Sequence, residues 1–198
     1  MIRRVELRDS KTIADIYNEY VIHSVATFET KPLKEGEMRS RIIEIFKNFP
    51  YWVYEIDDRV VGYCYAHPWK QRAAYKYTLE TTVYVSPDYV GKGIGKALMR
   101  KLIEECRKSG YHALIACITS GNEVSDSLHL KLGFKQVSFF EQVGLKFGRW
   151  LDVDWLEKRL DSVEIPRNPP IAWRDFRKDA QRIENILGKM SLSESEKV

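Results

Sequence analysis

The residues best suited to chemistry lie in and around a glycine-rich turn near the middle of the chain. Gly91, Gly93 and Gly95 alternate with larger residues, shortly after a strand-like run that stops at Ser86-Pro87. An amphipathic helical pattern follows, so the turn leads into a helix N-terminus. Free backbone N–H groups at such a terminus bind anions, and glycines have no Cβ that would keep a phosphate away. The turn therefore predicts a ligand that carries a pyrophosphate.

Two common phosphate-binding loops do not fit this turn. A Walker loop needs glycine at Val90 and Ser or Thr at Ala97, and a dinucleotide fingerprint needs glycine at Leu98. The turn instead resembles the R/Q-x-x-G-x-G/A loop of the GCN5-related N-acetyltransferases (GNAT), whose amides hold the pyrophosphate of acetyl-CoA. Val90 replaces the Arg or Gln of that pattern. One side-chain contact is thereby lost, whereas the backbone donors remain.

The resemblance implies which residues bind acetyl-CoA. The segment from Tyr89 to Lys96 would hold the pyrophosphate, and the backbone N–H near Val83 would polarise the thioester carbonyl. The implied acetyl-CoA residues are Val83, Tyr84, Val85, Val90, Gly91, Lys92, Gly93, Ile94, Gly95, Lys96, Asn122 and Ser125. No metal is expected, because no spacing of histidines and carboxylates matches a zinc site.

A carboxylate, Glu80, is placed on the central strand between Leu79 and Thr81, where packing gives no reason for one. A partly buried carboxylate at this point can take a proton from an attacking amine, directly or through water. The alternative role is a strand-end salt bridge to Lys76 or Arg72. The run from Glu80 also resembles the Glu-Ser-Thr-Val-Tyr-Val of the phosphinothricin acetyltransferase branch of the family, which favours Glu80 as a catalytic base.

Asn122 and His129 are seven residues apart, or about two helical turns, and Gly133-Phe134 follow. In most GNAT enzymes the pattern is Asn, then Tyr, then Gly-Phe, and the tyrosine protonates the thiolate. Histidine in place of tyrosine resembles the phosphinothricin-type branch. Because imidazole exchanges protons near neutral pH, His129 is predicted to be an acid or a second base. Structural roles stay open: Asn122 as a helix N-cap, and His129 as a packed, half-buried histidine.

The run from Ala66 to Tyr75 mixes aromatic and cationic side chains and resembles the branch motif Ala-x-Pro-Trp-Lys-x-Arg-x-Ala-Tyr. A guanidinium offers two parallel donors to a carboxylate, and aromatic rings shape a small pocket. The run from Lys146 to Val153 resembles the late hairpin of the same branch. The predicted substrate residues are Phe28, Glu29, Trp69, Arg72 and Tyr75. Plain aromatic packing is the alternative, and it is preferred for Trp150, Trp155 and Tyr84.

Alternating strand and helix patterns position these residues. Strands are predicted at 2–7, 51–56, 60–66, 79–85, 112–118, 134–143 and 150–160, and helices at 10–24, 33–49, from 94 onward and 124–132. Asp57-Asp58 marks a hairpin turn. This order predicts an α/β fold with one mixed sheet. The resemblance implies the GNAT acyl-CoA N-acyltransferase fold, whose central, mostly antiparallel sheet is flanked by helices.

Composition narrows the class of protein. The chain has 198 residues, 44% of them hydrophobic and 30% charged, and a net charge of +4, which indicates a globular domain and no nucleic-acid partner. No apolar run approaches the roughly 20 residues that cross a bilayer, so no membrane partner is expected. Three cysteines without a metal pattern predict reduced, buried thiols and a cytoplasmic location. Residues 1–164 are expected to form the GNAT domain, and 165–198 a partly helical or disordered C-terminal extension.

The resemblance implies transfer of acetyl from acetyl-CoA to the α-amine of a small amino-acid-like molecule, by direct attack in a ternary complex. Phosphinothricin, methionine sulfoximine and methionine sulfone are the substrates that the branch implies. A homodimer is expected, because the last hairpin of these enzymes often joins a second subunit. Acetylation of a polyamine or a protein N-terminus is the alternative reaction. A coenzyme-A-binding regulatory module without catalysis is the alternative from another class.

Overall fold

The computed structural model describes residues 1–160, so the predicted extension from residue 165 and the last residues of the predicted domain lie outside the described part. The main elements follow in the predicted order. The strands are β1 (Ile2–Arg4), β2 (Tyr51–Ile56), β3 (Arg59–Pro68), β4 (Thr78–Val85), β5 (Ala113–Thr119), β6 (Lys135–Lys146) and β7 (Arg149–Arg159). The α-helices are α1 (Ser10–His23), α2 (Glu35–Phe46), α3 (Ile94–Lys108) and α4 (Glu123–Lys131).

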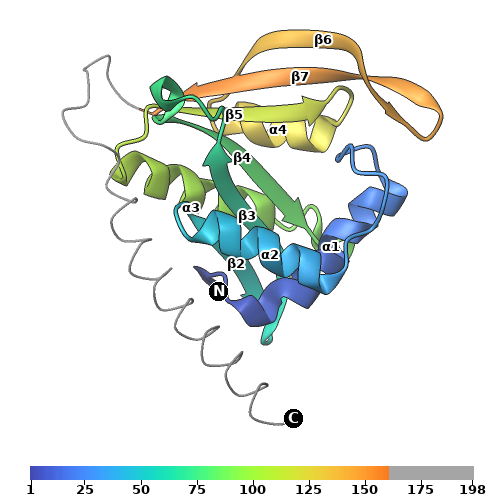
Figure 1. Ribbon diagram of the computed structural model, residues 1–198, viewed down its shortest axis with the longest axis vertical. Coiled ribbons are helices and arrows are strands. Elements are labelled where there is room, and N and C mark those ends of the chain that lie inside the picture. The colour runs from blue at the N-terminus through green and yellow to red at the C-terminus, as the bar shows by residue number, and fades with distance from the viewer. Residues whose placement is uncertain (161–198) are drawn as a thin grey trace, which may run out of the picture.

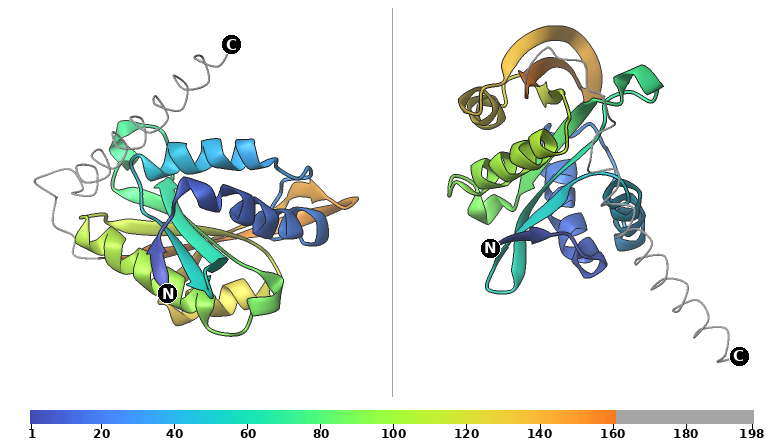
Figure 2. Two further views of the ribbon diagram at one scale, coloured as in Figure 1. Left: turned by 90° about the horizontal axis from the view of Figure 1, so that it is seen from below. Right: turned by 90° about the vertical axis from the view of Figure 1, so that its left-hand side faces the viewer.

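One sheet joins these strands in the order β1-β2-β3-β4-β5-β7-β6 (Figure 1). Within it the β4–β5 pairing is parallel, and each other pairing is antiparallel. Helices α1 and α2 cover one face of the sheet, and α3 and α4 lie on the other (Figure 2). The prediction of a mostly antiparallel sheet flanked by helices is confirmed.

Two apolar clusters hold the layers together. Leu98 and Leu102 of α3 pack with Leu114 of β5 on one face, and Ile13 of α1 and Ile42 of α2 are buried on the other. These side chains are fully or almost fully buried, and each such burial contributes about 1.5–3 kcal/mol. The sheet is therefore packed on both faces. A space inside it can open only where two neighbouring strands separate.

The strands β4 and β5 separate in the middle of the sheet. Their pairing covers Thr78–Glu80 and Ala113–Ile115, although β4 runs on to Val85 and β5 to Thr119. On its other side β4 stays paired with β3 as far as Val85. Beyond Glu80, one backbone edge of β4 consequently has no neighbouring strand.

Two predicted boundaries were wrong for identifiable reasons. The first strand ends at Arg4 and not at residue 7, because the Asp9 carboxylate accepts from the Glu6 N–H and bends residues 7–9 into a 3₁₀ turn. The second helix begins at Glu35 and not at Leu33, because the Asn18 side chain bonds both the N–H and the carbonyl of Leu33. The hairpin turn was predicted correctly, and Asp57 and Asp58 both have positive φ.

The structure also tests two further expectations, that the cysteines are buried and that no segment crosses a membrane. Cys64 and Cys106 are free and buried, as predicted, but Cys117 is free and exposed, which corrects the prediction for that residue. In the part of the chain that is described, no helix combines the length and apolar character needed to cross a bilayer.

Candidate active site

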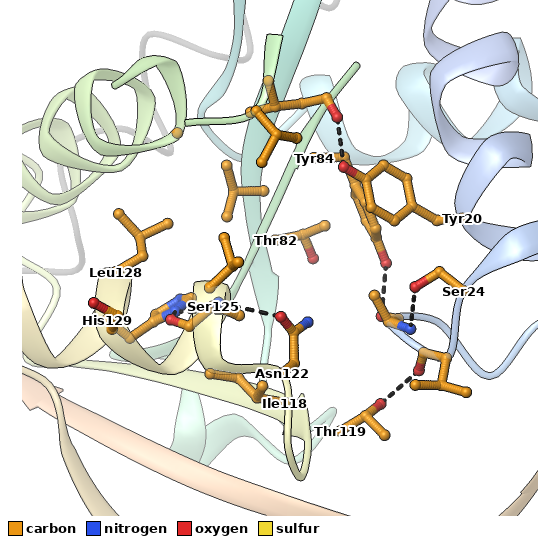
Figure 3. Close-up of a pocket in the computed structure, with 18 of the residues that line it drawn as sticks. Tyr20, Ser24, Thr82, Tyr84, Ile118, Thr119, Asn122, Ser125, Leu128 and His129 are labelled. Atoms are coloured by element: carbon orange, nitrogen blue, oxygen red, sulfur yellow. Dashed lines mark hydrogen bonds between the residues drawn. The ribbon is translucent and has the colours of Figure 1, made fainter. Parts of the chain in front are cut away.

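A cavity of about 930 Å³ occupies the space where β4 and β5 separate. Its walls come from β4, the glycine turn, the end of β5, α4 and the end of α1, and Figure 3 shows α4 side chains facing Tyr20 and Ser24 across it. The predicted site residues that line it are Val83, Tyr84, Val85, Val90, Gly91, Gly93, Ile94, Gly95, Lys96, Asn122, Ser125 and His129. The predicted residues that do not are Glu80, Lys92, Phe28, Glu29, Trp69, Arg72 and Tyr75.

The glycine turn has the geometry of an anion cradle. Gly91 and Gly93 have φ values of +82° and +80°, and a Cβ at either position would meet no atom within 4 Å. Gly93 is the N-cap of α3, and no side chain caps this helix. The first backbone N–H groups of α3 therefore remain available, together with the positive end of the helix dipole. Both features fit a pyrophosphate.

The free edge of β4 offers further backbone groups. Ser86 N–H donates to Val61 O of β3. Since successive residues of a strand point to opposite edges, Val85 and Val83 direct their backbone groups away from β3, towards the cavity. Val85 O is taken by the Tyr20 hydroxyl at 2.5 Å. The backbone groups of Val83 therefore remain available to hydrogen-bond a ligand that runs along this edge.

Polar and cationic side chains complete the fit to acetyl-CoA. The Ser120 hydroxyl lines the cavity and is buried without a hydrogen-bond partner among residues 1–160, so an amide-bearing ligand would satisfy it. Lys96, Lys131 and Arg149 line the same cavity and complement phosphates. Lys131 and Arg149 were not predicted as binding residues. The only signal was that Arg149 falls in the run that resembles the late hairpin of the branch.

Asn122 and His129 both lie on the cavity wall. The Asn122 side chain caps α4, because its Oδ1 accepts from Ser125 N–H at 3.2 Å. His129 Nδ1 lies 2.8 Å from Ser125 O and must donate to it, since a carbonyl only accepts. Nε2 of the neutral ring is then the acceptor. His129 is 3% exposed and packs edge-on against Phe134. Of the two predicted roles, this tautomer favours a base over an acid.

Burial lowers the pKa of His129, and the Ser125 hydrogen bond opposes that effect only in part. Below about pH 6.5 the unfolded chain therefore gains a proton that the folded chain resists, and the free energy of unfolding falls as pH falls. We expect His129→Asn, which can still donate to Ser125 O, to flatten this dependence between pH 7.5 and 5. Urea unfolding at several pH values measures it. His23→Asn, at an exposed histidine, is the control, and an equal flattening there would refute the assignment.

Glu80 lies at the vertex where the two strands separate. It is the last β4 residue paired with β5, opposite Ile115, and it is partly buried. Within the described residues it forms neither of the predicted alternative salt bridges, to Lys76 or to Arg72. Partial burial of the thiol raises the pKa of Cys117, a cavity residue, to about 11, and the charge of Glu80 adds to the rise. An unpaired carboxylate consequently stands at the vertex of the two strands, next to the cavity but not in its lining.

A second carboxylate lies on the same face of the sheet. Burial raises the pKa of Tyr65; a hydrogen bond with Thr82 and the charge of Arg41 oppose the rise, and the carboxylates of Glu80 and Glu29 add to it. Tyr65 is thus within electrostatic reach of all three charged groups. Glu29 is held 2.5 Å from Arg41 of α2. Two carboxylates near one tyrosine suit the recognition of an ammonium group.

Two of the predicted aromatic residues, Trp69 and Tyr75, belong to a cluster next to the cavity. Trp69 packs edge-on against Tyr75 at 5.2 Å and Trp155 at 5.9 Å between ring centroids. Trp155 pairs with Cys117 across β5 and β7, so the cluster adjoins the cavity wall. Trp155 therefore belongs to the same aromatic cluster as Trp69, whereas the sequence favoured a role in simple packing for Trp155. Arg72 is exposed and forms no ion pair with a described residue, so its guanidinium is available to a ligand.

Metal ligands do not gather within residues 1–160. No group of three or more His, Cys, Asp or Glu side chains lies close enough together there to hold an ion. The chemistry that the described site offers is carried by backbone donors, carboxylates and one imidazole.

Known proteins resemble this chain over most of its length. The sequence pattern described as the Acetyltransferase (GNAT) family matches residues 13–134. A phosphinothricin N-acetyltransferase of Alcaligenes faecalis is 38% identical over 163 residues, which cover 81% of this chain and 83% of that protein. An L-methionine sulfoximine/L-methionine sulfone acetyltransferase of Salmonella typhimurium is 35% identical over 166 residues, which cover 83% of this chain and 97% of that protein.

A solved structure with acetyl-CoA bound has a similar fold. A GNAT superfamily phosphinothricin acetyltransferase (Pat) from Sinorhizobium meliloti, in complex with acetyl-CoA, matches with a TM-score of 0.82 and 35% sequence identity. The match covers 86% of this chain and 94% of that chain.

Proposed function

The chain belongs to the Acetyltransferase (GNAT) family and is an N-acetyltransferase, and from this premise we propose that it acetylates the α-amine of a small amino-acid-like molecule. The acetyl donor is acetyl-CoA. The proposed acceptors are phosphinothricin, methionine sulfoximine and methionine sulfone, after the names of the relatives.

One observation carries the proposal: the separation of β4 from β5. The free edge at Val83 and the glycine cradle line the cavity at this separation, and Glu80 lies beside it, where the pairing of the two strands ends. A donor that extends from the cradle along β4 would end near Glu80. There it would meet an acceptor bound against the Trp69 cluster.

The residues divide the work between binding and proton transfer. Acetyl-CoA supplies a thioester as the activated acetyl group. The amides of the glycine turn and the N-terminus of α3 would bind its phosphates, and Val83 N–H would polarise the reacting carbonyl. Glu80 accepts the amine proton, directly or through water, as the amine nitrogen attacks the acetyl carbonyl. The new C–N bond replaces the C–S bond, and coenzyme A leaves as a thiolate. His129 Nε2 can serve as a second acceptor of the amine proton and pass it to this thiolate. Arg72 is available to the acid group of the acceptor, and the carboxylates of Glu80 and Glu29 attract its ammonium.

Release of coenzyme A tests the proposal across a panel of acceptors. The panel contains phosphinothricin, methionine sulfoximine, methionine sulfone, spermidine and an N-terminal peptide. We expect turnover on the first three, with kcat/KM at least about 100-fold above that on spermidine, because spermidine lacks the acid group that Arg72 would bind. Turnover on the peptide alone would mean that the acceptor is a protein N-terminus and not an amino-acid-like molecule. Binding of acetyl-CoA without turnover on any acceptor would favour the non-catalytic module.

We also infer that the protein is a cytoplasmic homodimer. Free, reduced cysteines and the use of acetyl-CoA support the location. The dimer is supported by the β6–β7 hairpin, where many apolar side chains are exposed on a surface too apolar for an isolated subunit. They are Val137, Phe139, Phe140, Val143, Leu145, Phe147 and Trp150.

The dimer makes a specific prediction at Trp150, which is 59% exposed and lies opposite Leu145 in the hairpin. We expect Trp150→Glu to shift the protein from dimer to monomer in light scattering at micromolar concentration, because burying an unpaired carboxylate in the interface costs several kcal/mol. Ile22→Glu, at an exposed apolar residue of α1, is the control and should remain dimeric. A monomeric wild type would contradict the inference.

A further inference from the structure

Lys146, the last residue of β6, is 3% exposed, and its ammonium group forms no salt bridge within the described residues, although the charge of Glu29 acts on it. Its Nζ donates instead to the backbone carbonyls of Tyr20 (3.3 Å), Ser24 (2.7 Å) and Thr27 (2.8 Å). These carbonyls belong to the last turn of α1 and to the segment that follows it. A cation at the C-terminus of a helix is favourable, and three acceptors use all three N–H bonds of the ammonium.

The segment Ser24–Glu29 is here called the acceptor loop, and strand side chains hold it from Ser24 to Thr27. Thr119 of β5 donates to Val25 O at 2.6 Å, and Tyr84 of β4 donates to Ala26 O at 3.3 Å. With the two Lys146 bonds, each carbonyl from Ser24 to Thr27 is fixed by a side chain of β4, β5 or β6. Figure 3 shows Thr119 and Tyr84 on either side of this part of the cavity.

The same loop is also pressed against β6. A Cβ on Gly144 would lie 1.9 Å from Cε1 of Phe28, so the Phe28 ring sits directly on the Gly144 backbone. Gly144 adjoins the irregular stretch of the β6–β7 ladder between Phe140 and Gly144, which displaces the strand locally. Lys146 and Gly144 therefore form two contacts of one clamp between the hairpin and the loop.

The acceptor loop contributes to both parts of the site. Ser24, Val25 and Ala26 line the cavity, and Glu29 carries the second carboxylate near Tyr65. Lys146 itself does not line the cavity, so it has no contact with a ligand there. Any effect of Lys146 on the reaction must pass through the loop.

We propose that Lys146 is a positioning residue, whose buried ammonium fixes the acceptor loop in the conformation that binds the acceptor amine. The reaction it serves rests on the proposed function. Losing the three carbonyl bonds would release Ser24–Glu29 from β6 while leaving the glycine cradle at the other end of the cavity intact. Acceptor binding would suffer, and acetyl-CoA binding would not.

The full-length protein with Lys146→Met tests this, because methionine keeps the length and apolar stem of lysine and removes the donors. We expect the KM for methionine sulfone to rise about 10- to 100-fold, as small displacements of binding groups do, and the Kd for acetyl-CoA by calorimetry to stay within twofold. Lys146→Arg, which can still donate to carbonyls, should recover part of the loss. Lys135→Met, at an exposed lysine of the same strand, should behave as wild type.

A second variant covers the case in which Lys146→Met fails to fold. Gly144→Ala keeps the ammonium but displaces the Phe28 ring, and it should raise the same KM. An unchanged acceptor KM in a folded Lys146→Met protein, or equal changes in acceptor KM and acetyl-CoA Kd, would overturn the proposal.

Hydrogen exchange separates this proposal from the proposed reaction. The amides of Ala26 and Glu29 bond to Ser24 Oγ and Thr27 Oγ1 within the loop. They should exchange faster in Lys146→Met than in wild type, whether or not any acceptor is turned over. Unchanged exchange at both amides would contradict the clamp, whereas fast exchange together with inactive wild type would contradict only the proposed reaction.

Discussion

Glu80→Gln is expected to lower kcat/KM for the acceptor about 10²- to 10⁴-fold, the range that a positioned general base supplies. The substitution preserves size and hydrogen-bonding capacity at the vertex of β4 and β5 but removes the proton acceptor. The defect should be largest at low pH and should shrink as pH rises through the pKa of the acceptor amine, since a free amine needs no base. Initial rates of coenzyme A release between pH 6 and 10 measure it.

A matched variant controls for the effect of removing any one carboxylate from the protein. Glu44 of α2 is exposed, and Glu44→Gln should leave the rate unchanged at every pH. The Kd for acetyl-CoA should be unaltered in both variants, because Glu80 does not line the cavity. A Glu80→Gln protein that loses activity equally at all pH values would have lost a structural or substrate-binding group, and Glu80 would no longer be assigned as the base.

Gly93→Val is expected to weaken acetyl-CoA binding about 30- to 150-fold, which corresponds to about 2–3 kcal/mol of lost hydrogen bonding to a charged group. Two physical effects combine. Gly93 has a φ of +80°, which costs a residue with a side chain about 1–2 kcal/mol. The space around it is empty of protein atoms, so the new side chain would occupy the place proposed for the pyrophosphate. Isothermal titration with acetyl-CoA measures the change.

The other end of the same helix provides the control. Gly110 follows α3 and has a φ of +82°, so Gly110→Val imposes a comparable backbone strain away from the cavity. Both variants should lower the melting temperature, but Gly110→Val should bind acetyl-CoA as wild type does. Equal losses of affinity would mean that Gly93 acts through the stability of α3 and not through the cradle.

The sequence predicted what depends on local patterns. Apolar residues at helical spacing after Gly93, strand alternation before Ser86 and the Asp57-Asp58 turn each report on a short segment, and the elements there formed as expected. The separation of β4 from β5 depends on the register between strands about 35 residues apart. No local sequence pattern could therefore predict this separation. Glu80 could be chosen from its unusual position, but its place at the vertex could not.

Long-range contacts also explain the residues that were missed. A lysine is ordinarily exposed, and Lys146 is buried only because carbonyls from residues 20–27 converge on it, more than 100 residues earlier in the chain. Trp155 joins the Trp69 cluster because β7 inserts between β5 and β6. Arg72 shows the reverse case, since its predicted role rests on a resemblance and its guanidinium forms no ion pair or side-chain hydrogen bond with a described residue.

Identification of the reaction product tests the central claim most directly. The protein would be incubated with acetyl-CoA and methionine sulfone, and the product analysed by mass spectrometry and by ¹H–¹⁵N NMR of the amino nitrogen. We predict one added acetyl group on the α-nitrogen, formed in proportion to the coenzyme A released. Coenzyme A released without acetylated product, or acetyl recovered on any other atom, would contradict the account.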